Sequence, residues 1–134
     1  MGRASQPTVL YDAECEFCRW SLAKLLAWDR PRQLCARPID SAEGQRLLAD
    51  LRPDERETSW HFIDRDGERR SAGRAAAPLL RELPGGRPLA ALLASFPGPT
   101  DSAYDWVSEH RPAFTKLISA GAVRRADTRI TSRC

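Results

Sequence analysis

The sequence is poor in lysine and has no long apolar run. No stretch approaches the roughly 20 apolar residues that span a bilayer, and residues 1–7 contain no apolar segment typical of a secretion signal. Lys24 and Lys116 are the only lysines, and the formal net charge is +3. So small a positive excess argues against a nucleic-acid binder. We therefore expect a cytoplasmic protein without nucleic-acid or membrane partners.

Cysteine is also sparse, with four residues in a chain of 134. A chain of this length, 42% hydrophobic and 29% charged, fits one domain. Without a secretion signal, four cysteines argue against a structural disulfide framework and favour catalytic, metal-binding or buried thiols. Cys35 falls inside a predicted strand, so we expect a small buried side chain there. We interpret Cys134 as a terminal thiol unrelated to the others.

The most informative segment runs from Val9 to Cys18, where a short apolar stretch leads into two cysteines spaced C-x-x-C. Unpaired N–H groups and the positive dipole end at a helix N-terminus favour thiolate over thiol, so we expect Cys15 to be the reactive sulfur. Cys18 shares a helical stripe with Leu22 and Leu26, which predicts a partly buried resolving thiol. Such a dithiol needs no organic cofactor.

Two other interpretations of this cysteine pair stay open. A zinc half-site would need two further ligands, and the sequence has no second C-x-x-C and no H-x-x-x-H. Both cysteines could also be inert thiols in a protein-binding module whose helical C-terminal half docks a partner. The residues that could complete a zinc site are Cys35, His61, His110 and Cys134.

Hydrophobic periodicity and the Pro and Gly positions predict alternating strands and helices. Ser41 is expected to cap the second helix, and the Asp66-Gly67 turn to close a hairpin. The predicted elements are a strand over 8–11, a helix over 16–29, a strand over 33–39, a helix from 42 to the Arg52-Pro53 step, a hairpin of 60–64 and 68–71, and a helix over 75–83.

This order predicts an α/β fold with a thioredoxin-like βαβ-α-ββ-α core. Two more helical segments, 89–96 and 102–109, follow on either side of Pro97-Gly98-Pro99. We expect one domain over 8–114 that includes a C-terminal helical extension, 88–111, with flexible termini at 1–7 and 120–134. His61 is expected to be a surface or interface side chain of the hairpin.

The motif Tyr11-Asp12-x-x-Cys15-x-x-Cys18 resembles the signature of the DCC family of thiol–disulfide oxidoreductases. Asp29, the Gly73-x-Ala75 step and Tyr104-Asp105-Trp106-Val107 leading to Arg111 extend the resemblance over about residues 8–114. Ala13 departs from it, because the family usually has glycine there. The resemblance implies disulfide exchange with a disulfide-containing protein or a low-molecular-weight thiol, and an electron-donating reductase.

Several residues near the motif have two interpretations. Asp12 is either a proton acceptor near Cys18 or the acceptor of an Asx-turn, and its place in the family signature favours the first. Phe17 and Trp20 form an apolar substrate lip or simply pack. We expect Glu16 to oppose thiolate formation and Arg19 to favour it. Tyr104 and Arg111 match family positions, but helix packing of the tyrosine and carbonyl capping by the arginine explain them without a chemical role.

Overall fold

The structure, a computed structural model, describes residues 6–56 and 59–133. Its centre is a four-stranded mixed sheet in the order β2-β1-β3-β4. Strands β1 and β2 are parallel, whereas β3 is antiparallel to both β1 and β4. The predicted thioredoxin-like α/β fold is confirmed. The strands are β1 (Thr8–Tyr11), β2 (Cys35–Pro38), β3 (His61–Ile63) and β4 (Arg69–Ser71).

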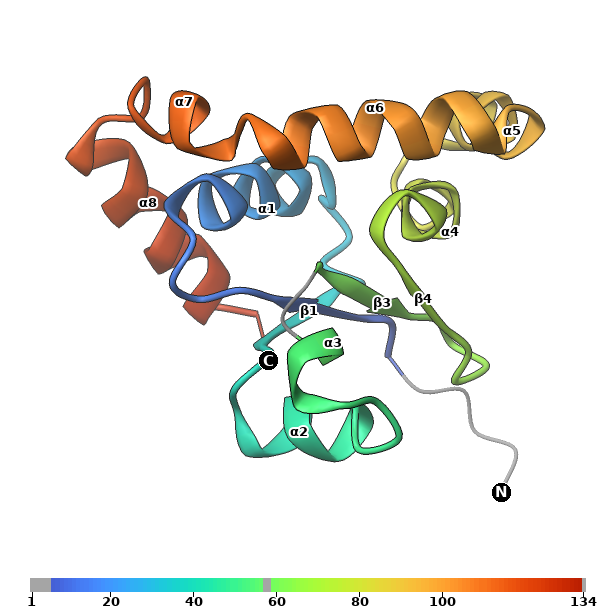
Figure 1. The fold of residues 1–134 in the computed structure, drawn as a ribbon, viewed down its shortest axis with the longest axis horizontal. Coiled ribbons are helices and arrows are strands. Elements are labelled where there is room, and N and C mark those ends of the chain that lie inside the picture. Colours follow the sequence, from blue (N-terminus) through green and yellow to red (C-terminus); the bar gives the residue numbers. More distant parts are fainter. Residues whose placement is uncertain (1–5, 57–58, 134) are drawn as a thin grey trace.

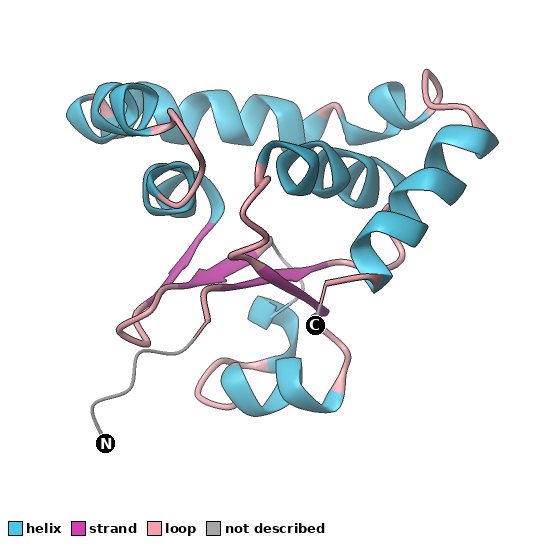
Figure 2. Cartoon of the chain, turned by 180° about the vertical axis from the view of Figure 1, so that it is seen from behind, coloured by secondary structure: helices cyan, strands magenta, loops and turns pink. Residues whose placement is uncertain are grey.

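Helices cover both faces of this sheet (Figures 1 and 2). One face carries α1 (Glu16–Trp28) and α4 (Ala76–Arg81), the latter continuing a 3-10 turn, and the other carries α2 (Ala42–Leu47) and α3 (Pro53–Arg56). An outer layer lies over α1 and α4, and the last helix packs beside α1. The outer layer consists of α5 (Arg87–Ser95), α6 (Pro97–Glu109) and α7 (Arg111–Thr115), and the last helix is α8 (Ala120–Thr131).

The core follows from the alternation of side chains along the strands. Val9 and Phe62 point toward α1 and α4, where they join the main cluster with Leu22 and Leu26. Leu10 and Ile63 point the other way and pack with Leu48 beneath α2. The stripe predicted for the first helix is therefore confirmed, and it fixes which face of α1 turns away from solvent.

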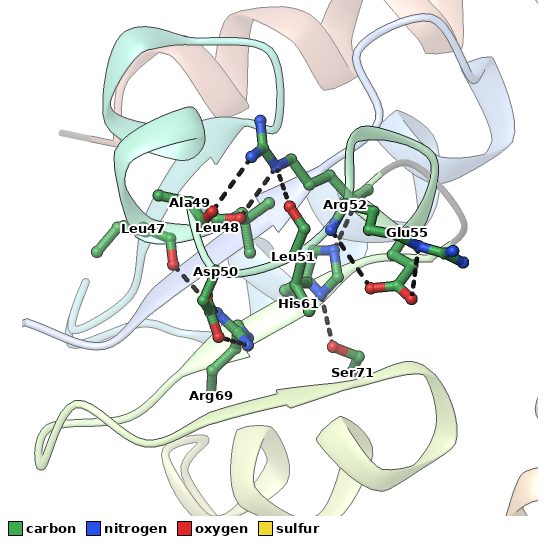
Figure 3. A network of polar contacts seen from close by, with 11 residues as sticks. Leu47, Leu48, Ala49, Asp50, Leu51, Arg52, Glu55, His61, Arg69 and Ser71 are labelled. Atoms are coloured by element: carbon green, nitrogen blue, oxygen red, sulfur yellow. Dashed lines mark hydrogen bonds and ion pairs between the residues drawn. The ribbon is translucent and has the colours of Figure 1, made fainter.

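The prediction for His61 is wrong. Its side chain is 1% exposed, because α2 and α3 cover the sheet face to which it points. Nε2 lies 2.8 Å from the carbonyl oxygen of Arg56, and Nδ1 lies 2.5 Å from Ser71 Oγ (Figure 3). Nε2 therefore carries the proton and donates to the carbonyl, while Nδ1 accepts from the hydroxyl. Both ring nitrogens are satisfied inside the fold.

A second polar link joins the α2 side to the hairpin. Figure 3 shows Arg69 of β4 directed at Asp50, with Nη1 2.6 Å from Oδ1 and Nη2 2.8 Å from Oδ2. The same guanidinium donates to the carbonyl of Leu47 at 3.2 Å. This bidentate geometry ties the end of α2 to the edge strand.

The C-terminus also differs from the prediction. Instead of a flexible segment from residue 120, the structure forms α8, whose residues Ala126 and Ile130 are buried. Arg133 is 5% exposed, and its Nη1 lies 2.7 Å from Oδ2 of the fully buried Asp29. A buried carboxylate needs such a partner, which fixes the chain end beside α1. At the other end, residues 1–5 lie outside the described residues, and Pro7 is buried.

Two helix boundaries also differ. Pro97 and Pro99 do not separate helices but form the first turn of α6, where a missing N–H costs nothing. The second predicted helix ends at Leu47, with Ser41 as its predicted cap, and the separate turn α3 follows from Pro53. The hairpin and the helix after it lie where the sequence predicts them, and Gly67 takes the positive φ of 86° that its turn requires.

Candidate active site

The dithiol lies where β1 runs into α1, above the carboxyl end of the strand. Cys15 is the N-cap of α1, with extended backbone angles, and its Sγ accepts the N–H of Cys18 at 3.2 Å. Asp12 shapes the approach: its Oδ1 accepts the N–H of Glu14 at 2.9 Å, and its carbonyl accepts the N–H of Cys15 at 3.2 Å. Ala13 is not at positive φ, so this turn accommodates the departure from glycine.

The two cysteines interact directly through their side chains. Both are half-buried free thiols, and the Cys18 thiol hydrogen-bonds to the sulfur of Cys15. This bond is the largest cause that lowers the pKa of Cys15 to about 6, and the N–H of Cys18 and the charge of Arg111 lower it further. The same bond and burial raise the pKa of Cys18. The charge distribution is therefore asymmetric, with a thiolate on Cys15 and a protonated Cys18.

Arg111 completes this site from the far end of the sequence. It is the first residue of α7, and its Nη1 lies 3.6 Å from Cys18 Sγ. Its Nε also donates to the carbonyl oxygen of Ser108 at 3.2 Å, so the capping function considered from the sequence exists as well. The guanidinium acts on both sulfurs, because it favours the anionic form of each.

The expected electrostatic effect of Arg19 is replaced by another pairing. Arg19 points toward α8, where its Nη1 lies 3.0 Å from each carboxylate oxygen of Asp127. The charges that act on the pKa of Cys15 are those of Arg111 and Asp12, with Asp12 raising it. Asp12 is a near neighbour in the sequence, whereas the effect of Arg111 is not visible from the residues that flank the cysteines.

Two hollows meet at the dithiol. An open one of about 580 Å³ contains Cys15, and a pocket of about 260 Å³ lies on the side of Cys18. Asp12, Ser108 and Arg111 line both, so they form the boundary between the two spaces. Asp12 thus lies between the two spaces, and the bond from the N–H of Glu14 to its Oδ1 is the Asx-turn that the sequence offers as one interpretation of this residue.

Aromatic side chains surround the start of α1. Phe17 stacks on Phe114 of α7 with ring centroids 5.2 Å apart and on Trp20 at 6.2 Å. Phe17 and Tyr104 line the pocket beside Cys18, whereas Trp20 lines a different hollow, which Phe17 and Phe114 also line. Both side chains therefore pack against other aromatic rings, and Phe17 also lines the pocket beside Cys18.

The remaining metal candidates do not gather at this site. Cys35 is 5% exposed, so its predicted burial is confirmed, but it is disulfide-bonded and not one of the free thiols that the cysteine count favoured. Cys134 lies outside the described residues. Over 6–56 and 59–133, no group of three His, Cys, Asp or Glu side chains is arranged to hold a metal ion. The structure thus gives the zinc interpretation no support among these residues.

A dithiol at the N-terminus of the first helix, after the first strand of a thioredoxin-like sheet, defines the thiol–disulfide oxidoreductase class of site. A family model described as DCC1-like thiol-disulfide oxidoreductase matches residues 9–117. The chain belongs to this family, which confirms the resemblance found in its motif. No curated protein and no solved structure matches the chain. Within the described residues, no helix is long and apolar enough to cross a membrane.

Proposed function

We propose that this chain exchanges disulfides through Cys15 as the nucleophile and Cys18 as the resolving thiol. The observation that carries the proposal is the capping geometry of Cys15, whose sulfur accepts the N–H of Cys18 at 3.2 Å and has its pKa lowered to about 6. At neutral pH most of Cys15 is then thiolate, the form that attacks disulfides.

The first step forms a mixed disulfide. The Cys15 thiolate attacks one sulfur of a substrate disulfide, the substrate S–S bond breaks, and the second substrate sulfur leaves as a thiolate that takes a proton from water. The open hollow around Cys15 is the space in which the substrate sulfurs approach. Cys18 stays protonated in this step, because the pKa of its thiol is raised by the hydrogen bond to Cys15 and by burial.

The second step releases the substrate. Once Cys15 is in a mixed disulfide it carries no charge, so the largest cause that raises the pKa of Cys18 disappears. The Arg111 guanidinium, 3.6 Å away, remains and favours the Cys18 thiolate. Asp12, on the boundary of both hollows, accepts the proton of Cys18. The thiolate attacks Cys15 Sγ, the S–S bond between Cys15 and the attacked substrate sulfur breaks, that sulfur leaves as a thiolate that takes a proton from water, and a Cys15–Cys18 disulfide closes.

The cycle moves two electrons from the dithiol to the substrate, so a donor must return them. A reductase or a low-molecular-weight thiol is the donor class that this chemistry requires, and substrates are disulfide-containing proteins or small disulfides. The cytoplasmic location stays a prediction from the sequence.

The proposal is tested by trapping the mixed disulfide. Replacing Cys18→Ser removes the resolving sulfur, so a disulfide substrate should remain attached to Cys15 and appear as a mass increase that dithiothreitol removes. Cys15→Ser is the matched control and should trap nothing. Equal trapping by both variants, or none by Cys18→Ser with its thiol intact, contradicts the assignment of the two sulfurs.

The protein-binding alternative has one specific observation in its favour. Leu89 and Leu92 of α5, and Phe96 at its C-cap, are large apolar side chains that are between 42% and 55% exposed. A module of this kind would keep its binding when both Cys15 and Cys18 are changed to serine. Loss of disulfide exchange in that double variant, with full folding, favours the redox function instead.

A further inference from the structure

We propose that the pocket behind Cys18 binds an aromatic or branched apolar group that flanks the sulfur attacked by Cys15. This inference rests on the proposed function and names the class of substrate that the same site prefers. The protein would then select a substrate disulfide by the side chain next to the substrate's cysteine, as well as by how accessible that disulfide is.

The position of the pocket supports this assignment. Asp12, Ser108 and Arg111 line both this pocket and the open hollow that contains Cys15. A substrate whose sulfur approaches Cys15 therefore has its next few atoms at a shared boundary, with one apolar space directly behind it. Cys18 forms part of the wall, so the bound group would lie beside the resolving thiol.

The chemistry of the walls selects an apolar occupant. Val9, Leu22 and Val107 supply aliphatic surface, and Tyr11, Trp60 and Tyr104 supply aromatic surface. The two charged residues, Asp12 and Arg111, stand at the boundary, because they also line the other hollow. An apolar group that enters loses contact with water without separating a charge from its partner.

The volume fits one side chain. At about 260 Å³ the pocket is below the roughly 300–1,000 Å³ of sites for drug-sized ligands. It therefore suits a single ring or branched chain rather than a folded segment of a partner. The flanking sulfur stays outside, within reach of the Cys15 thiolate.

The test compares two alkylating reagents that differ by one ring, iodoacetamide and N-benzyl iodoacetamide, at pH 7. Each rate on Cys15 is divided by the rate on N-acetylcysteine, and fragmentation of the labelled peptide confirms the modified residue. We expect the benzyl reagent to be favoured about tenfold, since partial burial of a ring contributes roughly 1.4 kcal/mol. Because alkylation needs no disulfide exchange, this readout is separate from turnover.

Variants locate the binding of the ring. Val107→Phe fills the pocket and should reduce the benzyl preference to near one, whereas Val123→Phe on α8 makes the same change outside the pocket and should leave it unchanged. Ser21→Leu, on a different wall, should act like Val107→Phe and serves if that variant does not fold.

Two results would overturn the inference. One is a benzyl preference near one in the unmodified protein, and the other is a preference that survives both pocket-filling variants, which would place the ring on the Phe17 and Phe114 surface instead. A separate assay of 2-hydroxyethyl disulfide reduction reports the proposed function. Normal reduction without a benzyl preference rejects the pocket alone, and a benzyl preference without reduction rejects the proposed function alone.

Discussion

The guanidinium of Arg111 lies 3.6 Å from the sulfur of Cys18, although 93 positions separate the two residues in the sequence. The cation comes from α7, in the outer helical layer, and the thiol from α1 beneath it. The helical extension after the thioredoxin-like core therefore supplies a charge to the dithiol as well as covering α1 and α4.

Replacing Arg111→Gln should make the thiolate form of both Cys15 and Cys18 less stable. The pKa of Cys15 should rise by about half a unit to one unit, the size expected for losing one nearby half-exposed cation. The measurement is the rate of Cys15 alkylation between pH 4 and 9. Arg111→Lys keeps the charge and should restore part of the shift, and Arg124→Gln on α8 is an exposed control. An unchanged profile in Arg111→Gln would show that the guanidinium is too well solvated to matter.

The reduction potential of the Cys15/Cys18 couple should change slope near pH 6. Above that pH the reduced form holds a Cys15 thiolate and a Cys18 thiol, because the pKa of Cys15 is lowered to about 6 and that of Cys18 is raised. Reduction then takes up one proton with two electrons, so the potential should fall by about 30 mV per pH unit, against about 59 mV below pH 6. A titration against glutathione at several pH values measures it. If the potential instead falls by about 59 mV per pH unit at every pH, two protons are taken up throughout, and the thiolate assignment is contradicted.

Breaking the buried ion pair should strongly destabilise the fold. Asp29→Ala leaves the Arg133 guanidinium buried without its carboxylate and removes the acceptor of the N–H groups of Gln33 and Leu34. We expect a loss of about 3–5 kcal/mol in the free energy of unfolding, measured with urea. Arg133→Met should cost a similar amount.

Two comparisons separate this ion pair from general effects of mutation. In the double variant of Asp29→Ala and Arg133→Met the cost should be smaller than the sum of the single costs, because neither charge is then left alone. Arg129→Met, exposed on α8, should change stability by less than about 0.5 kcal/mol. Additive costs in the double variant would mean that the two side chains act independently.

His61 should make stability depend on pH. Burial lowers the pKa of its imidazole below 6.5, so the unfolded chain takes up the proton more readily than the folded one. Its contribution to stability is complete above pH 6.5 and is lost as the pH falls through the lower folded-state pKa. Urea midpoints between pH 8 and 4 should therefore decrease less steeply in His61→Gln than in the unmodified protein, while His110→Gln, at an exposed position, keeps the original slope.

Much of the site follows from local sequence. The strand, the capping cysteine and the stripe of Cys18, Leu22 and Leu26 are encoded within 20 residues, so periodicity and capping rules are enough to place them. Arg111 was matched to the family pattern, but its contact with Cys18 depends on how the outer helices pack. No spacing rule gives a contact made across the fold.

The C-terminal helix and the burial of His61 also depend on packing between elements, which sequence patterns do not reveal. Ser119 as an N-cap and the spacing of Val123, Ala126 and Ile130 are signals that would have predicted α8, but the many charged residues between them suggested a solvated tail. His61 alternates correctly along its strand, and its burial depends on α2 and α3 covering that face. Whether a strand has one or two covered faces is decided by tertiary structure.

The ion pair at Arg133 has a practical consequence for anyone who shortens this protein. The segment matched by the family ends at residue 117, before α8 begins. A fragment trimmed to that segment would expose the side of α1 on which α8 packs. It would also leave the buried Asp29 carboxylate without Arg133, its ion-pair partner. Redox measurements on such a fragment would report on a damaged scaffold, so expression boundaries should extend through the last helix.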